Sequence, residues 1–442
     1  MLRVNEVADS DGFPDNVDVA IIGGGIVGVA AAYELARFGV SVALFEKGYI
    51  GAEQSSRNWG FVRQQNRDLL ELPLAMRSLR RWGELSDEIG FDLGFRRTGI
   101  LYGSDNPTEI EKWEEWGRAA RQQGFVSHML SASEIREISG VQHPNFKAGV
   151  WSPDDGRAEP SMAAPAIAEG AKKFGANIYQ TCAVRGFDIS AGRISGVVTE
   201  RGLVRSSTVI CAGGAWSSRL CRQYGIALPS ANIVGSAMRT SVAPEVTNGC
   251  LSAGNFAMRR RIDGAYTLAV PGHGRMELTP QGLGYAAKFY EVYRSKVAKK
   301  LKIRIGKSFF NGPEAAGTWS LDDISPFEKQ RVLNPSPDHE WAAIALRRVI
   351  SAYPVLSQVR VVQMWAGLID TTPDLFPVIS TVDQLPGLVI ASGFSGHGFA
   401  TGPGAGQLIA EMVTNRQPFT DISDYRLSRF SDGSATKRPE MM

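Results

Sequence analysis

Three glycines near the start of the chain have the spacing of a loop that binds a nucleotide pyrophosphate. Gly23, Gly25 and Gly28 fit the pattern G-x-G-x-x-G in the segment GGGIVG. In such a loop the first glycine permits a tight turn, the second lets the backbone approach the pyrophosphate, and the third lets a helix pack closely on a strand. The spacing indicates a dinucleotide site, to which Ile26 and Val27 contribute as residues of the same loop.

A carboxylate stands where such a site needs one. Glu46 follows the apolar residues 40–45 and can accept hydrogen bonds from the ribose hydroxyls of an adenosine. Lys47 comes next and belongs to the same candidate site. The ligand indicated is a dinucleotide with a free 2'-hydroxyl group, and these residues alone leave both NAD and FAD open.

A strand, a turn, a helix and a second strand must bring these residues together. Residues 18–22 are a short apolar run, typical of a strand buried on both faces of a parallel sheet. The helix that begins at the turn presents unpaired N–H groups and a partial positive charge to the pyrophosphate. This context makes the motif more specific than the glycine spacing alone, for which a turn without a ligand is the alternative.

Two more glycine-rich turns follow predicted strands. Residues 207–211 run into Ala212, Gly213 and Trp216, which indicates a second pass beneath the same nucleotide, with simple close packing as the alternative. Residues 388–392 run into a third turn, before a helix predicted over 404–413. The candidate residues of the third turn are Gly393, Gly396, His397, Gly398 and Phe399.

The third turn bears on the choice of cofactor. A glycine-rich loop that opens a helix directs backbone N–H groups at one point, where they would stabilise negative charge on the N1/C2 carbonyl edge of a flavin during reduction. NAD needs no such device, so the loop favours FAD. His397 has two interpretations, proton transfer or a structural role beside the ring.

The composition sets outer limits on the function. A chain of 442 residues is long for one core, so two domains are expected, and its 48 Lys and Arg against 45 Asp and Glu give no charge-based case for nucleic acid. The four cysteines form no C-x-x-C pair and are expected in the core, in a reducing compartment, and no metal is expected. Residues 1–16 lack the pattern of a secretory signal, and we expect no membrane-spanning helix.

The rest of the chain alternates between helical and strand patterns. The segment SSRNWG suits a loop along a phosphate and polyol, with Ser55 or Ser56 also acting as a helix N-cap. Helices are expected over 69–85, 161–174 and 341–350, helical periodicity over 107–139, and strands over 96–103, 177–180, 183–188, 193–200, 259–262 and 359–365. The basic residues 294–307 are interpreted as a solvated face or a docking site.

With these segments in order, the chain resembles the FAD-dependent D-amino acid oxidase, glycine oxidase and sarcosine oxidase superfamily. The resemblance covers nearly the whole chain through VDVAIIGGGIVG with Glu46, SSRNWG, VICAGGAWS, WAGLIDTTPDLFPVI and GLVIASGFSGHGFATGP. Members that tether flavin covalently have a cysteine near the fourth stretch. Residues 365–374 hold none, so FAD is expected to bind noncovalently.

The resemblance implies a fold and a set of cofactor contacts. It implies an α/β protein, with a Rossmann-like FAD domain of the glutathione-reductase type interleaved with an α+β substrate domain on a mixed or antiparallel sheet. The FAD domain is expected over 16–95, 150–225 and 349–422, the substrate domain over 96–149 and 226–348, and flexible termini at 1–15 and 431–442. The implied FAD contacts beyond the glycine turns are Glu46, Lys47, Ser55, Ser56, Asn58, Trp59, Gly60, Val184 and Gly367.

The implied reaction is oxidation of a carbon–nitrogen bond. An uncharged amine or amino acid would lose a hydride from its α-carbon to flavin N5, and the resulting imine would hydrolyse. Arg63 is the candidate clamp for a substrate carboxylate, with an exposed or structural arginine as the alternative. An oxidase is expected to place a cation near N5, for which Lys288, Lys302 and Lys307 are candidates.

The resemblance leaves the electron acceptor and the assembly open. Oxygen or a membrane quinone could reoxidise the flavin, and the expected location is the cytoplasm, either free or at the periphery of the inner membrane. The chain could act alone, as a homo-oligomer, or as the flavin subunit of a multi-subunit amino acid or opine dehydrogenase. An NAD-binding dehydrogenase and a redox sensor without turnover also stay open.

Overall fold

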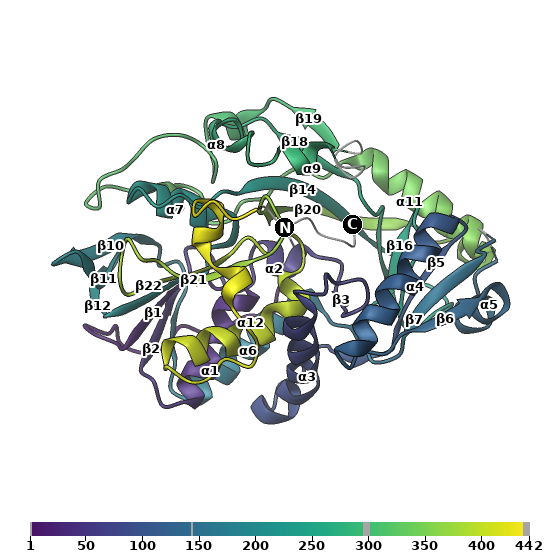
Figure 1. Cartoon of the computed structure of the whole chain (residues 1–442), viewed down its shortest axis with the longest axis horizontal. Coiled ribbons are helices and arrows are strands. Elements are labelled where there is room, and N and C mark those ends of the chain that lie inside the picture. The colour runs from purple at the N-terminus through teal and green to yellow at the C-terminus, as the bar shows by residue number, and fades with distance from the viewer. Residues whose placement is uncertain (1, 143–144, 295–300, 436–442) are drawn as a thin grey trace.

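A parallel sheet wrapped by helices and a large second sheet make up the protein, and Figure 1 shows them side by side. The computed structural model describes residues 2–142, 145–294 and 301–435. Segments from the start, middle and end of the chain alternate between the two parts. The order of the elements interleaves the two sheets, and the fold is mixed α/β, as the sequence predicts.

The first sheet has six strands in the order β21-β22-β13-β1-β2-β9. Its strands are β1 Val19–Ile22, β2 Val42–Phe45, β9 Asn177–Tyr179, β13 Thr208–Cys211, β21 Val378–Thr381 and β22 Leu388–Ser392. β1 pairs in parallel with β2 and β13, β2 with β9, and β13 with β22, whereas β21 is antiparallel to β22. Because parallel strands end at the same edge of a sheet, the three glycine turns that follow β1, β13 and β22 meet there.

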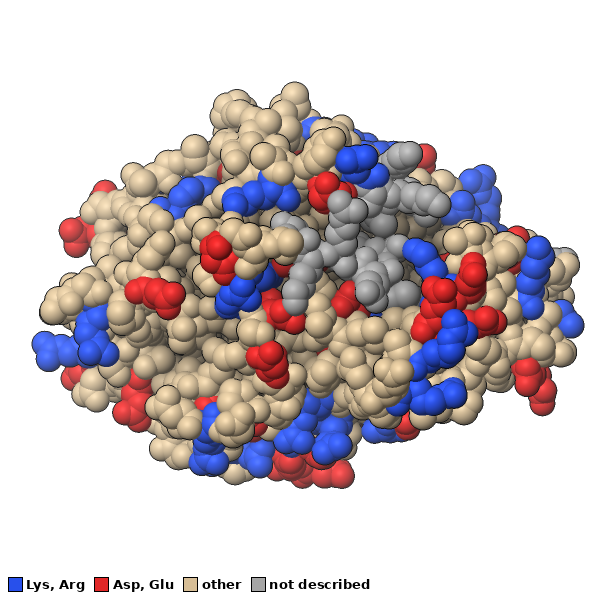
Figure 2. All heavy atoms as spheres, viewed as in Figure 1, with Lys and Arg blue, Asp and Glu red and all other residues tan. Residues whose placement is uncertain are grey.

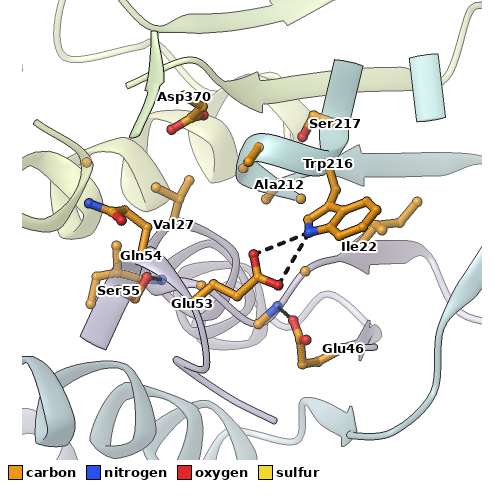
Figure 3. Close-up of a pocket in the computed structure, with 18 of the residues that line it drawn as sticks. Ile22, Val27, Glu46, Glu53, Gln54, Ser55, Ala212, Trp216, Ser217 and Asp370 are labelled. Atoms are coloured by element: carbon orange, nitrogen blue, oxygen red, sulfur yellow. Dashed lines mark hydrogen bonds between the residues drawn. The ribbon is translucent and has the colours of Figure 1, made fainter. Parts of the chain in front are cut away.

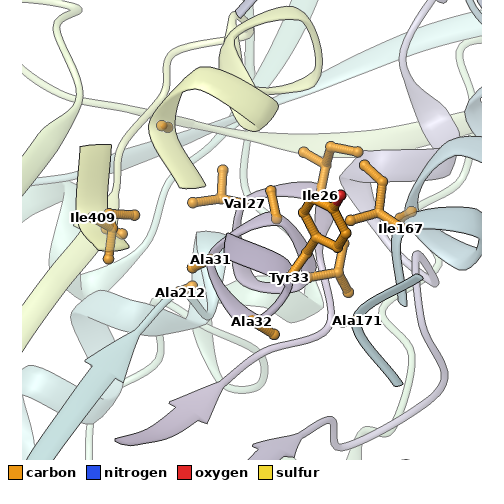
Figure 4. Packing of buried hydrophobic residues seen from close by; sticks show 14 of the residues in the cluster. Ile26, Val27, Ala31, Ala32, Tyr33, Ile167, Ala171, Ala212 and Ile409 are labelled. Carbon is orange, nitrogen blue, oxygen red and sulfur yellow. The ribbon is translucent and has the colours of Figure 1, made fainter. Parts of the chain in front are cut away.

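Four helices form the layer on one face of this sheet. They are α1 Ile26–Arg37, α3 Leu72–Ile89, α6 Pro160–Lys173 and α12 Gly398–Val413. All residues of α1 except Arg37 are buried, and Figure 4 shows its side chains between Ile167 of α6 and Ile409 of α12. Small residues allow this close packing, because a Cβ atom on Gly406 of α12 would lie 2.5 Å from the backbone of Ala30 in α1.

The second sheet has ten strands, in the order β19-β18-β14-β17-β16-β15-β5-β7-β6 with β20 paired to β14. Its strands are β5 Ile100–Ser104, β6 His128–Ser131, β7 Ala148–Ser152, β14 Ala231–Thr240, β15 Cys250–Ser252, β16 Ala257–Arg260, β17 Tyr266–Ala269, β18 Gly274–Glu277, β19 Leu301–Arg304 and β20 Val361–Thr371. Most pairs are antiparallel, and β5–β15 and β18–β19 are parallel. Helices α4 Pro107–Gln122, α5 Ala132–Ser139 and α11 His339–Ala352 accompany this sheet.

Shorter elements connect the two parts. The small strands are β3 Phe61–Val62, β4 Arg96–Arg97, β8 Gly156–Arg157, β10 Val184–Ser190, β11 Arg193–Thr199 and β12 Gly202–Arg205. The short helices are α2 Gln54–Arg57, α7 Ser217–Gln223, α8 Pro280–Tyr285, α9 Tyr290–Arg294 and α10 Pro326–Lys329, with 3-10 turns at Gly214–Trp216, Lys307–Phe309, Pro354–Leu356, Ser423–Tyr425 and Leu427–Phe430.

Three local predictions differ from the structure. Neither Ser55 nor Ser56 is an N-cap, because α2 begins after Glu53 and Ser55 Oγ instead accepts the amide N–H of Ile26 at 2.8 Å. Helix α12 begins at Gly398 rather than at residue 404 and includes Pro403, since its packing on α1 and α3 offsets the weak helix propensity of its glycines. Strand β20 runs to Thr371, well past residue 365, because β14 pairs with it along its length.

The first residues are tied to the body of the protein. The amide of Asn5 donates to the carbonyl of Ser161, and the amide of Ser10 donates to the carbonyl of Ile178, both at 2.9 Å. These contacts hold the segment along α6 and the edge strand β9. The flexibility expected for residues 1–15 stays a prediction.

The surface carries mixed charge, and the cysteines lie inside. Figure 2 shows basic and acidic side chains interspersed on the face in view. All four cysteines are buried and unbridged, as expected for core residues. Within the described ranges, no helix has the length and apolar character needed to cross a bilayer.

Candidate cofactor and active site

One elongated pocket lies where the three glycine turns meet. Its walls come from β1 and α1, from the segment around α2, from the turn after β13, and from the loop between β22 and α12. Figure 3 shows side chains from these distant segments pointing into the same space. The predicted residues that line it are Gly23, Gly25, Ile26, Val27, Glu46, Lys47, Ser55, Asn58, Val184, Ala212, Gly213, Trp216, Gly396, Gly398 and Phe399.

Close backbone contacts at its glycines fix the shape of the first glycine turn. Gly23 has a φ of +106°, and a Cβ atom there would lie 2.5 Å from the carbonyl oxygen of Ala212. A Cβ atom on Gly28 would overlap the carbonyl oxygen of Gly23. The first turn of α1 follows directly, and a helix start offers amide N–H groups without intrahelical acceptors. The turn is therefore suited to an anionic group such as a pyrophosphate.

Glu46 is held at the end of β2 by two backbone amides. Its carboxylate accepts the N–H of Gly24 and the N–H of Gly48, each at 2.7 Å. Burial raises the pKa of Glu46, while Lys47 and the two amides act in the opposite direction. Each carboxylate oxygen retains a further acceptor position, so Glu46 can still accept a ribose hydroxyl.

A small charged cluster forms one wall of the pocket. The indole N–H of Trp216 lies 3.3 Å from both carboxylate oxygens of Glu53, as Figure 3 shows. Lys47 Nζ donates to Glu53 Oε1 at 2.6 Å and lies 4.7 Å from the centre of the Trp216 ring. The cluster joins the segment before α2 to the turn after β13 and fixes this wall of the pocket.

Asp370 anchors the loop at the other end. Its carboxylate accepts the amide N–H of Gly393 at 2.7 Å, and its carbonyl accepts the amide of Ser395 at 2.9 Å. Burial raises the pKa of Asp370 to about 6, although hydrogen bonds from Gly393 and Ser392 oppose the shift. A titratable carboxyl group thus lines the pocket beside the start of α12.

Several predicted residues support the pocket without lining it. Gly28 packs beneath the first turn, and a Cβ atom on Gly367 would overlap Gln54. Gly60 has a φ of +79° and leaves room for the guanidinium of Arg259. The remaining predicted residues outside the lining are Ser56, Trp59, Gly393, His397 and Arg63.

Arg63 and His397, the two residues predicted to do chemistry, face a polar network next to the pocket. Arg63 donates to the backbone carbonyls of Gln65 and Asn66, and its guanidinium lies 5.8 Å from the Tyr102 ring centre. His397 Nδ1 lies 2.7 Å from the Glu71 carboxylate. Burial and the nearby Arg67 lower the pKa of His397, so we assign a neutral ring whose Nδ1–H donates to Glu71.

Some residues of the pocket lining were not predicted from the sequence. Glu53 and Gln54 directly precede Ser55 and Ser56. Their position beside this predicted contact segment could have identified them as lining residues. Phe327, Leu368 and Asp370 also line the pocket. Phe327 had no sequence signal, because it enters from an irregular segment far along the chain.

None of the three candidate lysines belongs to the pocket lining. Lys288 donates to the carbonyl of Phe430 at 2.6 Å, and Lys302 pairs with Glu340 at 2.5 Å. Of the basic segment 294–307, residues 295–300 lie outside the described residues. Over the described part of the chain, no three His, Cys, Asp or Glu residues are grouped to hold a metal ion.

The fold and the pocket together define a nucleotide-binding α/β protein whose glycine turns converge on one pocket. The family model for FAD dependent oxidoreductases, named DAO, matches residues 18–412. The chain belongs to this family. The predictions of the family, the FAD cofactor and the enzyme class are thereby confirmed.

Curated relatives cover nearly the whole chain at modest identity. Sarcosine oxidase subunit beta of Arthrobacter sp is 25% identical, covering 94% of this chain and 91% of the relative. Glycine oxidase of Geobacillus kaustophilus is 24% identical, covering 93% and 97%. Mouse mitochondrial dimethylglycine dehydrogenase is 23% identical over 96% of this chain, which spans only 46% of that protein.

Solved structures share the fold as a whole. L-amino acid deaminase from Proteus myxofaciens, in complex with anthranilate, superposes with a TM-score of 0.93 at 29% identity, covering 97% of both chains. L-proline dehydrogenase from P. horikoshii gives a TM-score of 0.78 at 26% identity, covering 96% of this chain and 100% of that one.

Proposed function

We propose that this enzyme oxidises the carbon–nitrogen bond of an amino acid or a secondary amine. The observation that carries the proposal is the convergence of three glycine turns on one pocket in a chain of the FAD-dependent family. The similar proteins named above act on sarcosine, glycine, L-proline or L-amino acids, which supports this substrate class. When bound, FAD would accept the hydride of the substrate at N5.

The residues of the pocket fit FAD. Gly23 and Gly28 leave no space for a side chain, so the first turn stays packed closely on α1 and on Ala212 at the edge of the pocket. Two buried lining atoms, Ser217 Oγ and Gln54 Oε1, have no hydrogen-bond partner in the described protein. Such orphaned polar atoms are expected where a bound ligand completes the hydrogen bonds.

The chain's own residues would then hold each part of the cofactor. The first turn and α1 would bind the pyrophosphate, and Glu46 would accept the ribose hydroxyls. The loop from Gly393 to Phe399 would present amides to the flavin, while His397 holds that loop against α3 through Glu71. FAD would be noncovalent, because residues 365–374 include no cysteine.

The division into domains follows from the same proposal. Residues 16–95, 150–225 and 349–422 would form a Rossmann-like FAD domain of the glutathione-reductase type. Residues 96–149 and 226–348 would form the substrate domain. The parallel sheet belongs to the first set, and most strands of the ten-stranded sheet belong to the second.

The experiment that tests this function is an anaerobic substrate screen. D-amino acids, N-methyl amino acids, L-amino acids and cyclic imino acids are added to the yellow protein, and loss of flavin absorbance is followed. We expect one class to bleach the flavin. A protein that remains colourless and cannot be reconstituted with FAD would contradict the proposal, and a yellow protein that no amine reduces would favour a redox sensor.

Arg63 remains the proposed partner of the substrate carboxylate. Arg63 lies outside the pocket lining. A substrate would therefore have to extend past the lining residues for its carboxylate to pair with this guanidinium. We expect Arg63→Ala to raise the KM of the best amino acid about tenfold or more, through loss of a charge-assisted pair. Arg63→Lys is the control, because it keeps the positive charge but loses the bidentate guanidinium. An unchanged KM in Arg63→Ala would refute the role of Arg63.

The electron acceptor and the assembly need separate tests. Peroxide formation in air, compared with dye reduction, separates an oxidase from a dehydrogenase that uses a quinone or another protein. The similarity to a sarcosine oxidase subunit beta favours a flavin subunit of a larger complex as the second candidate. Size-exclusion of the lone chain, followed by a dye assay of the eluted species, decides whether it turns over substrate unaided. We propose the cytoplasm as its location.

A further inference from the structure

A second cavity next to the flavin pocket is lined by arginines. Arg3, Arg239, Arg259 and Arg261 line it, and among the described residues no Asp or Glu is part of its wall. Asn58 lines both this cavity and the flavin pocket, so the two adjoin. None of these arginines has a role in the proposed oxidation.

The register of the large sheet places two of these side chains, Arg239 and Arg259, on one face. Arg239 on β14 stands opposite Thr267 on β17, and Arg259 on β16 stands opposite the same Thr267. On the other side, Arg239 stands opposite Gln363 on β20. Residues directly opposite in a sheet point to the same face, so the row is a built feature of the sheet and not a chance meeting of flexible surface side chains.

The acids behind the cavity do not neutralise its cations. Glu159 forms a two-point pair with Arg259, at 2.8 and 3.3 Å, and Asp263 lies 3.1 Å from both Arg239 and Arg261. The four cations thus face two anions, which leaves a positive excess. An excess of this kind in a partly desolvated cavity favours an anionic ligand.

Two of the arginines have capacity left for such a ligand. Arg259 is fully buried and also donates to the carbonyl of Trp59 at 2.6 Å, so its role is structural. Arg239 Nε is buried and has no hydrogen-bond partner among the described residues, and the side chain is 34% exposed. Arg261 is 17% exposed and shares Asp263 with Arg239. It also lies 3.9 Å from Glu159, which is already paired with Arg259.

We propose that this cavity is a binding site for a small organic carboxylate, held by Arg239 and Arg261. The planar guanidinium matches a carboxylate with two parallel hydrogen bonds. Trp365 and Leu2 supply an apolar wall for a short carbon skeleton. The site is distinct from Arg63 and independent of whether an amine is the substrate.

The test is direct binding to the FAD-loaded protein. Pyruvate, acetate and inorganic phosphate are titrated by calorimetry, and the flavin absorbance is recorded in parallel. We expect the two carboxylates to bind and to perturb the flavin spectrum, because Asn58 borders both cavities. We expect Arg239→Gln and Arg261→Gln each to weaken the Kd for pyruvate about tenfold, with FAD content and melting temperature retained.

The controls keep the outcome decisive. Arg193→Gln alters an exposed arginine at the turn of β11 and should leave the Kd unchanged. If Arg261→Gln does not fold, Arg239→Gln decides alone, and Arg239→Lys serves if that variant fails too. The inference is overturned if pyruvate does not bind, if phosphate binds as tightly as pyruvate, or if Arg63→Ala removes binding that Arg239→Gln leaves intact. None of these readouts requires turnover, so a failed substrate screen leaves them interpretable.

Discussion

Some residues at the pocket matter because they leave room for neighbouring backbone, and others because they bear a charge. The two roles can be tested separately. Gly28 leaves room for the backbone of Gly23, because any side chain at this position would collide with that backbone rather than with a flexible group. Asp370 carries charge, because its carboxyl group is buried in the pocket wall with a raised pKa.

Replacing Gly28 with alanine is expected to remove FAD binding. The added Cβ would push α1 away from the first turn and destabilise the fold by about 1–3 kcal/mol, the usual cost of overpacking. FAD content and chemical denaturation measure the two effects. Gly284→Ala is the matched control, since a Cβ atom there has nothing within 4 Å; equal FAD content in both variants would contradict the assignment of the loop.

The raised pKa of Asp370 predicts that the affinity of the apoprotein for FAD depends on pH. Its pKa is raised to about 6, so the carboxyl is neutral below that pH and negatively charged above it. A negative charge in the pocket repels the anionic pyrophosphate, so the affinity of the apoprotein should fall a few-fold as the pH rises through this value. Asp370→Asn keeps the acceptor for Gly393 and should remove the step. Fluorescence titration of FAD measures it, and identical pH profiles would rule the effect out.

At the scale of elements, α12 depends on its glycines for contact with two other helices. Gly404 lies against the carbonyl of Leu74 in α3, and Gly406 lies against Ala30 in α1. These contacts bring the start of α12 to the pocket.

Gly406→Ala should therefore destabilise the protein. Alanine gains about 1 kcal/mol of helix propensity, but overpacking against α1 costs about 1–3 kcal/mol, so we expect a net loss. Gly117→Ala in α4 is the control, because the nearest atom to its new Cβ is the Ser127 hydroxyl at 3.3 Å, and there the propensity gain should prevail. Urea denaturation of both variants gives the sign, and a stabilised Gly406→Ala would show that the helices can separate freely.

For the molecule as a whole, a buried carboxyl group outside the pocket lining should shape the pH dependence of stability. Glu314 is 5% exposed and accepts the amide of Asn232 at 2.8 Å and the hydroxyl of Thr279 at 3.0 Å. Burial raises its pKa from 4.5 to about 7, although these hydrogen bonds oppose the shift. Between these two pH values the folded protein binds more protons than the unfolded chain, so stability falls as the pH rises.

Glu314→Gln should remove that fall. The wild-type protein is expected to lose about 3 kcal/mol of unfolding free energy through this group between about pH 5 and about pH 8, whereas the isosteric amide does not titrate. The difference between the two denaturation profiles isolates Glu314 from other groups. Parallel profiles would contradict the raised pKa.

Local sequence patterns were enough to predict the glycine turns and the carboxylate that line the pocket. The strand, turn and helix around Gly23 to Gly28, the carboxylate of Glu46 and the turn at Ala212 depend on neighbours within a few residues, so their pattern is readable in the chain. The buried strands were predictable for the same reason, because a short apolar run between turns has few other uses.

The packing of distant segments sets which residues share a wall of the pocket and which way each side chain faces. Ser55 supports α1 instead of capping α2, His397 turns to Glu71, and the row of arginines exists only through the register of β14, β17 and β16. These outcomes depend on packing between segments that are far apart in sequence. Local propensity carries no information about such contacts, which is the physical reason that the sequence could not supply them.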